Sequence, residues 1–387
     1  MSSKPWHECW WINWVLPVTK PIVLLGEAYG SNEAKLGFGF VGASGVELLR
    51  LLNEAEIITL TSEDHSFISR FWNLGDPACI DAVWRLHPEV HRANVFPFHP
   101  HANDIGSLFV DKRDGMRGYP LLTGGRRKKS GYVSREYIPH LEALADEIIS
   151  VDPNLVIAFG NTPLWALCGL TGISKVRGST RLSTHTAVGY KVLPTYHPAA
   201  VLRQWELRPV TVMDLVKAKR EAEFPEVRRP ACEIWIEPDL VDLWEFKRRY
   251  ITDFAAVDIE TAGNQITCIG FAPTPTTALV VPIWDSRKRN KSYWKTLADE
   301  SAAWVFIRSI LEDRSIRKVF QNGLYDLAFT WRANRVPTFG ATEDTMLLQH
   351  ALQPEALKGL GFLGSIYTDH GAWKQEHKNS QTIKADA

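Results

Sequence analysis

Residues 22–42 read IVLLGEAYGSNEAKLGFGFVG, and this stretch decides the fold. Its apolar start, residues 22–25, is typical of a buried strand. The glycines that follow allow the backbone to approach a ligand closely, because glycine has no side chain. The same segment contains an acid early, Glu27, and an aromatic residue late, Phe40. We therefore predict a ligand-binding loop at the carboxyl end of a buried strand.

Strand and helix signals alternate from this stretch outward to about residue 225. Short apolar runs typical of strands lie at residues 22–25, 93–96, 155–159 and 191–194. Helical spacing is found at residues 46–52, 135–150 and 212–223. A further helix is predicted to open with Thr162 as its cap and Pro163 in its first turn, and to close near Gly169. Alternation of this kind predicts an α/β/α sandwich with a mostly parallel sheet, whose ligands bind beyond the carboxyl ends of the strands.

A length of 387 residues suggests two or three domains of roughly 150 residues each. The formal net charge is zero, so no global attraction to nucleic acid or to a membrane follows. The five cysteines form no CxxC pair, which argues against a disulfide framework and against a cysteine-rich metal site. The sequence contains no signal peptide and no apolar run near the roughly 18 residues of a membrane span. We expect a reduced, intracellular protein.

The segment FPEVRRP, residues 224–230, interrupts the pattern with two prolines and several charges. We place a first domain at residues 1–225, a linker at 226–231 and a second domain at 232–387. In the second domain, strands predicted at 254–260, 266–272 and 278–283 are joined by short turns, one of them at Gly263 and Asn264, which indicates an antiparallel meander. A strand at 233–236 precedes this meander, and helices are predicted at 240–250, 302–311 and 324–334.

Several motifs of the first domain resemble those of the uracil-DNA glycosylase superfamily, with family four as the nearest group. The motifs, in chain order, are GEAYG at 26–30, FVG at 40–42, VIAFGNT at 156–162, KVRG at 175–178 and YHPAAVLR at 196–203. Each motif is weak alone, but all of them occur in order over roughly residues 20–220. The resemblance implies an enzyme that flips uracil out of DNA and excises it.

The resemblance also implies a role for each matched residue. Phe40 would stack on the flipped uracil, Asn94 would read its Watson–Crick edge, and Ala28 and Tyr29 would line the same pocket. His197 would donate to uracil O2, while Glu27 would position or activate water or stabilise the cationic sugar. Leu202 would fill the gap left by the flipped nucleotide. Arg203 and Arg177 would contact the DNA.

Three departures from the family pattern affect this interpretation. Tyr29 replaces a proline, and its ring could narrow the pocket. Ala28 stands where the most active relatives, which belong to another family, carry an aspartate. Phe96 and Phe98 occupy the region where a family-four iron–sulfur cysteine is expected, so we expect no cluster.

The second domain contains a pattern of acids that suggests a metal site. Asp258 and Glu260 lie two residues apart on a predicted strand, so both point to the same face. Asp326 follows in the segment NGLYDLAF at 322–329. Oxygen-only clusters suit Mg²⁺ or Mn²⁺, and two such ions can activate water in phosphodiester hydrolysis. The pattern resembles DEDD 3′–5′ exonucleases, which implies a ribonuclease H-like domain with Asp258, Glu260 and Asp326 as metal ligands.

The fourth acid of that family is missing from the sequence. Only Asp344, Asp369 and Asp386 follow Asp326, and none has a tyrosine four residues before it or a histidine five residues before it. We therefore expect an incomplete exonuclease domain that binds metal poorly and hydrolyses slowly or not at all.

The order of the two domains resembles the front part of some bacteriophage family A DNA polymerases. This resemblance implies a DNA-processing protein of the cytoplasm, in a phage-infected bacterial host, with DNA and a polymerase domain as partners. An alternative is a catalytically inactive module that senses uracil or grips template DNA in a replicative polymerase.

Overall fold

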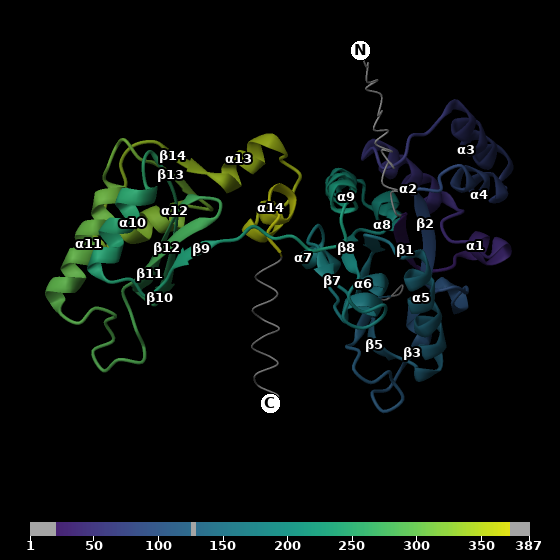
Figure 1. Ribbon diagram of the computed structural model, residues 1–387, viewed down its shortest axis with the longest axis horizontal. Coiled ribbons are helices and arrows are strands. Elements are labelled where there is room, and N and C mark those ends of the chain that lie inside the picture. Colours follow the sequence, from purple (N-terminus) through teal and green to yellow (C-terminus); the bar gives the residue numbers. More distant parts are fainter. Residues whose placement is uncertain (1–20, 125–128, 372–387) are drawn as a thin grey trace, which may run out of the picture. The chain divides into compact units, whose positions relative to one another are not determined.

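The computed structural model describes residues 21–124 and 129–371. These residues form two compact units, with the boundary between Val227 and Arg228. Figure 1 labels the elements of both units.

The first unit is built on a five-stranded sheet with the strand order β2-β1-β6-β8-β7. The four longer strands, β2, β1, β6 and β8, are parallel, and β7 joins β8 in antiparallel orientation at one edge. This confirms the predicted, mostly parallel sheet. The strands are β1 (Ile22–Ala28), β2 (Val90–Phe96), β6 (Val156–Phe159), β7 (Arg181–Leu182) and β8 (Lys191–Thr195).

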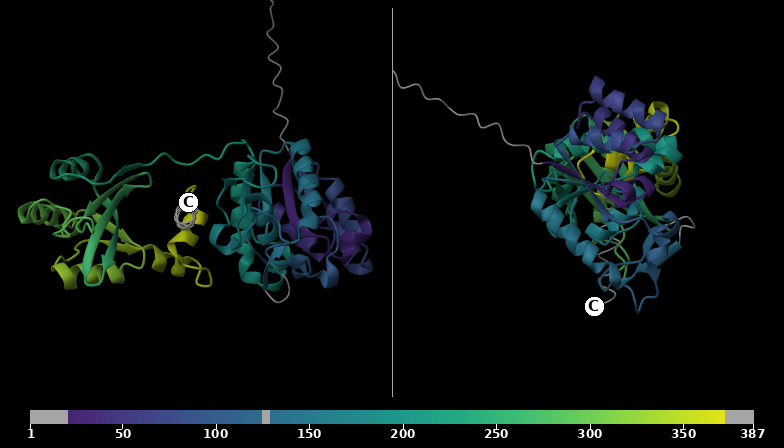
Figure 2. Two further views of the ribbon diagram at one scale, coloured as in Figure 1. Left: turned by 90° about the horizontal axis from the view of Figure 1, so that it is seen from below. Right: turned by 90° about the vertical axis from the view of Figure 1, so that its right-hand side faces the viewer.

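Helices cover both faces of this sheet, which confirms the α/β/α sandwich, and the layers can be followed in Figure 2. One core joins alternate strand residues such as Leu24 and Ile157 to Leu49 and Leu215 of the helices. Other helices contact β1, β2 and β6 outside this core. The helices are α1 (Ser31–Leu36), α2 (Ala43–Glu54), α3 (Ser62–Leu74), α4 (Ala78–Arg85), α5 (Ile138–Val151), α6 (Asn161–Cys168), α7 (Ile173–Val176), α8 (Pro198–Arg203) and α9 (Arg208–Glu221).

A small second sheet has the order β3-β5-β4, and its strands lie between β2 and α5 in the sequence. Its strands were not predicted from the sequence, and they are β3 (Phe109–Val110), β4 (Leu122–Gly124) and β5 (Lys129–Val133). β4 contacts α6. This contact brings Thr123 and Gly124 to the same cavity as the ends of the main strands.

The second unit has a six-stranded mixed sheet in the order β14-β13-β10-β11-β12-β9. The meander of β10, β11 and β12 is antiparallel as predicted, whereas β13 runs parallel to β10 and β14 runs parallel to β13. The turn at Gly263 adopts a φ of 60°, which glycine tolerates. The strands are β9 (Glu233–Trp235), β10 (Phe254–Ala262), β11 (Gln265–Thr274), β12 (Thr277–Pro282), β13 (Arg317–Phe320) and β14 (Thr342–Asp344).

Helices pack against this sheet through a second apolar core that includes Phe246, Ile269 and Phe306. The predicted helices at 240–250 and 324–334 agree with the structure at both ends. Capping boxes at Asp239 and Thr296 fix where two of the helices begin. The helices are α10 (Leu240–Tyr250), α11 (Leu297–Leu311), α12 (Leu324–Asn334), α13 (Thr345–Leu352) and α14 (Leu360–Tyr367).

Candidate functional site

A cavity of about 660 Å³ lies at the carboxyl ends of the main strands of the first unit. The parallel pairing of β1 and β2 sets Gly26 opposite Asn94, so the glycine-rich loop and the asparagine meet at one sheet edge. Of the residues predicted from the sequence, the cavity is lined by Glu27, Ala28, Phe40, Asn94, His197 and Arg203. Its wall also includes residues that the sequence did not single out, among them Glu33, Ser44, Asn103, Ile105, Thr123, Asn161, Ile173 and Tyr196.

Two glycines of the loop leave room for the side chains of the cavity. A Cβ on Gly26 would stand 2.8 Å from both the Asn94 amide nitrogen and the tip of the Phe40 ring. A Cβ on Gly39 would stand 2.1 Å from Asn94 Oδ1. Real Cβ atoms are never this close to another heavy atom, so any side chain at either position would displace Asn94 or Phe40. The loop is therefore rich in glycine because it packs against its own cavity residues.

Phe40 is held in an unusual backbone conformation. Its φ is 57°, in the left-handed region that non-glycine residues rarely adopt, and its ring is buried. The Trp84 indole N–H donates to the Phe40 carbonyl at 2.8 Å. Glu33 Oε1 accepts the backbone N–H groups of Val41 and Gly42, both at 3.2 Å. These bonds, at the Phe40 carbonyl and at the two residues after it, hold a conformation that would otherwise be strained.

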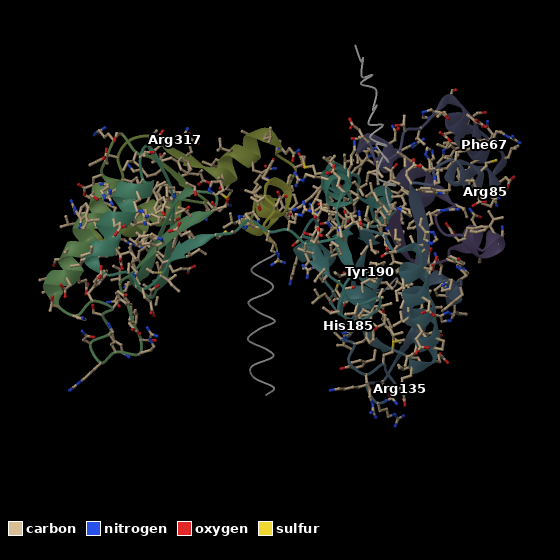
Figure 3. The ribbon with its side chains drawn as sticks, viewed as in Figure 1. Phe67, Arg85, Arg135, His185, Tyr190 and Arg317 are labelled. Atoms are coloured by element: carbon tan, nitrogen blue, oxygen red, sulfur yellow. The ribbon has the colours of Figure 1, made fainter. Side chains whose placement is uncertain are left out.

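An ion pair between Arg92 and Asp81 links the glycine-rich loop to α4. The Arg92 guanidinium donates to the carbonyl of Gly39 at 3.0 Å and to Asp81 Oδ1 at 2.9 Å. The same guanidinium lies over the rings of Phe38 and Trp84. Asp81 and Trp84 both come from α4, whose last residue, the exposed Arg85, is labelled in Figure 3. This helix was not predicted from the sequence, and so neither were the groups that hold the Phe40 segment.

Glu27 lies at the end of β1 and is paired with Thr162 of α6. The Thr162 hydroxyl donates to Glu27 Oε2 at 2.5 Å. Burial raises the pKa of the Glu27 carboxyl above its usual value, while the hydrogen bond from Thr162 and the nearby charge of Arg203 oppose the rise. Thr162 was predicted to cap α6, but that prediction is wrong, because Gly160 is the N-cap and the hydroxyl of Thr162 is used by Glu27.

His197 caps α8 and is held as one tautomer. The backbone N–H of Ala199 donates to His197 Nδ1 at 3.1 Å, so Nδ1 is unprotonated and Nε2 carries the hydrogen. Burial, helped by the positive charge of Arg203, lowers the pKa of His197 to about 4. The imidazole is therefore neutral at physiological pH and still has one N–H to donate. Its ring is stacked with Phe40 at 5.9 Å between centroids.

Asn94 contributes a buried amide to the cavity with one oxygen unused. The side chain is only 8% exposed. Its Oδ1 accepts no hydrogen bond from any group in residues 21–124 and 129–371. A buried acceptor without a partner is costly, so this oxygen is suited to a ligand that brings an N–H group.

Tyr29 was predicted to line the pocket, and the structure corrects this. The Tyr29 hydroxyl donates to the carbonyl of Gly37 at 2.9 Å, beyond the end of α1, and its own carbonyl is hydrogen-bonded to His99 Nδ1 at 2.9 Å. The ring is not part of the cavity wall, whereas Ala28 and Gly30 on either side of it are. The replacement of proline by tyrosine therefore leaves the cavity open.

The three residues predicted to contact DNA are placed differently. Leu202 is 47% exposed on α8, and Arg203 lies beside it at the cavity. Arg177, in contrast, is 1% exposed and forms a buried ion pair with Asp214 of α9, with its Nε 2.7 Å from Asp214 Oδ2. The prediction that Arg177 contacts DNA is wrong, because its guanidinium faces the interior. Thr195 completes this group by donating to Asp214 Oδ2 at 2.7 Å.

Arg177→Met is expected to lower the free energy of unfolding of the first unit by about 3–5 kcal/mol, because it leaves the buried Asp214 without its charged partner. Chemical denaturation monitored by circular dichroism measures this loss. The double variant Arg177→Met with Asp214→Leu is expected to recover most of the stability, since an apolar pair of similar size replaces both charges. A double variant as unstable as the single one would contradict this account of the pair.

The acids of the second unit lie near one another. Asp258 and Glu260 are both exposed and alternate with buried residues along β10, as predicted. Asp326 is buried, and its Oδ1 accepts the backbone N–H of Ile259, the residue between them, at 3.1 Å. Burial, with the negative charge of Asp258 and of Asp344, raises the pKa of Asp326 to about 6. Asp344 itself caps α13 and accepts backbone N–H groups, so it has a structural role.

These acids do not form a metal site as they stand. In the part of the chain that the structure describes, no group of three or more His, Cys, Asp or Glu side chains could hold a metal ion. The assignment of Asp258, Glu260 and Asp326 as ligands of a weakly held Mg²⁺ or Mn²⁺ therefore gains no support from the described residues, and Asp326 Oδ1 already accepts the backbone N–H of Ile259. The described cysteines, Cys79, Cys168, Cys232 and Cys268, are all free, and Cys9 lies outside the described residues.

None of the helices in residues 21–124 and 129–371 combines the length and the apolar character that a membrane crossing requires.

Comparisons with known proteins identify a family for the first unit. The family model of the uracil DNA glycosylase superfamily matches residues 14–224. The type-4 uracil-DNA glycosylase of Saccharolobus solfataricus is 29% identical over 200 residues, which are 51% of this chain and 69% of that protein. Brucella melitensis NrnC overlaps 37% of this chain with a TM-score of 0.26 and 21% identity, and the overlap spans 63% of NrnC, less than two thirds of its length. The EXD2 exonuclease domain overlaps 35% of this chain and 69% of its own, with a TM-score of 0.25 and 14% identity.

Proposed function

The chain belongs to the uracil DNA glycosylase superfamily, and on that premise we propose that its first unit excises uracil from DNA by hydrolysing the N-glycosidic bond. The observation that carries the proposal is the combination of groups in one cavity. A stacking ring, an unpaired amide oxygen, a neutral imidazole N–H and a carboxylate come from Phe40, Asn94, His197 and Glu27. An enzyme needs these groups to bind a base and to cleave the bond between the base and its sugar.

The base is recognised by stacking and by its hydrogen-bonding edge. A flipped uracil stacks on Phe40, and its N3–H donates to the oxygen of Asn94 that is otherwise unpaired. The amide nitrogen of Asn94 donates to uracil O4. Cytosine presents an amino group and an unprotonated N3 at these positions, so it is rejected. Flipping costs a few kcal/mol, which this pocket and the exposed Leu202 offset.

The bond that breaks joins C1′ of the deoxyribose to N1 of uracil, and its electron pair leaves with the base. The Nε2–H of His197 donates to uracil O2 and stabilises the negative charge that develops there. A neutral donor is suited to this role because it holds the departing anion and keeps its own proton. A water molecule then adds its oxygen to C1′ and gives up a proton, which neutralises the departed uracil anion, so the products are uracil and an abasic site.

Glu27 acts on the sugar side of the breaking bond. Its ionised carboxylate either stabilises the positive charge on the sugar or orients the water that attacks C1′. Both roles need the charged form, which Thr162 and Arg203 favour against the effect of burial. Arg203 at the cavity contacts a DNA phosphate in this proposal, and Ala28 forms part of the pocket floor.

The test is a release assay with single- and double-stranded oligonucleotides that contain one uracil, followed by alkali to cut abasic sites. The wild-type chain is expected to yield strand cleavage at uracil, and none at cytosine or thymine in matched oligonucleotides. Tight binding of uracil-containing DNA without an abasic product would refute excision. That outcome would instead support the second candidate function, an inactive module that senses uracil or grips template DNA.

We further propose that residues 1–225 form the glycosylase domain, that 226–231 are a linker, and that 232–387 form a domain of the 3′–5′ exonuclease type. The acids Asp258, Glu260 and Asp326 motivate the second assignment because they lie near one another at β10. The proposed setting is an intracellular DNA-processing protein that works with a phage-type family A polymerase domain. Magnesium-dependent release of nucleotides at ordinary proofreading rates would show that the second unit is more active than we propose.

A further inference from the structure

An exposed tryptophan lies next to the proposed uracil pocket. Trp205 opens a short 3-10 helix, Trp205–Leu207, two residues after Arg203, which lines the cavity. The indole is 61% exposed. Leu202 on the preceding helix is also exposed, so two large apolar side chains flank the cavity arginine. Exposing an indole to water costs free energy, so a binding partner that covers the ring would gain free energy.

The back of the indole is fixed to the protein. The Arg208 guanidinium lies 5.1 Å from the centre of the Trp205 ring. Arg208 is itself anchored to α2, because its Nε donates to Glu47 Oε1 at 2.9 Å and its Nη1 donates to Glu54 Oε2 at 2.5 Å. Glu47 is buried. One face of the ring therefore rests on an anchored cation, and little conformational entropy remains to be lost when the other face is covered.

We propose that Trp205 is a stacking platform for an unpaired base next to the flipped uracil. The inference rests on the proposed function, since it places the extruded nucleotide in the neighbouring cavity. Aromatic side chains that stack on bases accept any base, because every base has a π face. In a duplex that face is already covered by the adjacent base pair. The platform therefore favours single-stranded or locally opened DNA as the substrate.

The first experiment measures binding of a single-stranded oligonucleotide with one uracil by fluorescence anisotropy. Trp205→Ala is expected to weaken binding about tenfold, the usual effect of losing one stacked base. Trp205→Phe is expected to retain most of the affinity, because it keeps a ring. The control is Trp72→Ala on α3, which removes an indole that is 54% exposed and is expected to leave affinity unchanged.

A second substrate identifies what the ring contacts. Oligonucleotides in which an abasic residue replaces the base on the 5′ or the 3′ side of uracil are compared with the parent. For the wild-type chain, one of these abasic oligonucleotides is expected to bind about tenfold more weakly than the parent oligonucleotide. For Trp205→Ala, the same abasic oligonucleotide and the parent are expected to bind with equal affinity. As in a double-mutant cycle, this result would assign the lost binding affinity to the contact between that one base and the Trp205 ring.

Equal affinity of Trp205→Ala and the wild type would overturn the proposal, and so would an equal loss in Trp72→Ala. A loss in Trp205→Ala that persists with both abasic neighbours would also overturn it, since no base would then be the partner. Release of uracil is measured on the same samples. A wild-type chain that binds through Trp205 but releases no uracil would refute excision and leave the platform standing.

Discussion

Glu27→Gln is expected to lower the rate of uracil release about 100- to 10,000-fold, the usual contribution of a positioned acid or base. Glutamine has nearly the same shape, and its oxygen can still accept the Thr162 hydroxyl that now donates to Glu27 Oε2. Only the charge is lost, so DNA affinity is expected to change little. Single-turnover release of uracil measures the effect. Loss of affinity with an unchanged rate would mean that Glu27 serves only the shape of the loop.

The pH dependence of the wild-type rate identifies the group that must be ionised. Burial raises the pKa of Glu27 above its usual 4.5, so the rate is expected to fall as the pH drops through a midpoint above 4.5. His197 does not interfere above pH 5, since its pKa is about 4. Glu27→Gln is expected to remove this acid limb. An acid limb that persists in the variant would assign the titration to a group other than Glu27.

Thr162→Val is the companion variant, because it is nearly isosteric and removes only the hydroxyl. The hydrogen bond from Thr162 lowers the pKa of Glu27, so its loss raises that pKa. The acid limb is therefore expected to move to higher pH, while the rate well above the midpoint changes less. A limb at the wild-type position would show that Thr162 does not tune Glu27.

The fold was predictable where apolar periodicity is strong. The buried strands and the amphipathic helices α5 and α10 have such patterns, whereas α9 and α12 were predicted although their apolar residues are not confined to one face. The helices α1 and α4 were not predicted, because they have only six and eight residues and neither has a side-chain cap at its start. These short helices matter for the site, because α1 carries Glu33 and α4 carries Trp84, which fix the segment around Phe40.

The residue types of the site could be predicted from the sequence, but the orientations of several side chains could not. The family resemblance of the KVRG motif implied a DNA contact for Arg177, yet its partner Asp214 lies 37 residues further along the chain and holds its guanidinium in the interior. Tyr29 lies between two residues of the cavity wall, but its hydroxyl bond to Gly37 turns the ring elsewhere. Thr162 precedes a proline as a helix cap often does, but in the fold its hydroxyl donates to Glu27. In each case a tertiary partner, invisible in the local sequence, decides the orientation.

His197→Phe is expected to lower the rate of uracil release about 100- to 1,000-fold, as the loss of one preorganised donor to a developing anion does. Phenylalanine keeps a ring against Phe40, so stacking in the pocket and DNA affinity are expected to remain close to wild type. The donor is the Nε2–H, because Nδ1 is occupied by the N–H of Ala199. His197→Gln restores an N–H group at similar reach and is expected to recover part of the rate.

The chemistry of the leaving group separates this role from a packing role. A fluorine at C5 of uracil withdraws electrons and stabilises the departing anion without help from the protein. If His197 stabilises the same charge, the defect of His197→Phe is expected to be smaller with 5-fluorouracil than with uracil, because catalysis gains only from interactions stronger in the transition state. An equal defect with both bases would mean that His197 positions the base or shapes the pocket. The hydrogen bond from the Ala199 N–H would then only hold the His197 ring in place, and the proton that it leaves on Nε2 would have no role in catalysis.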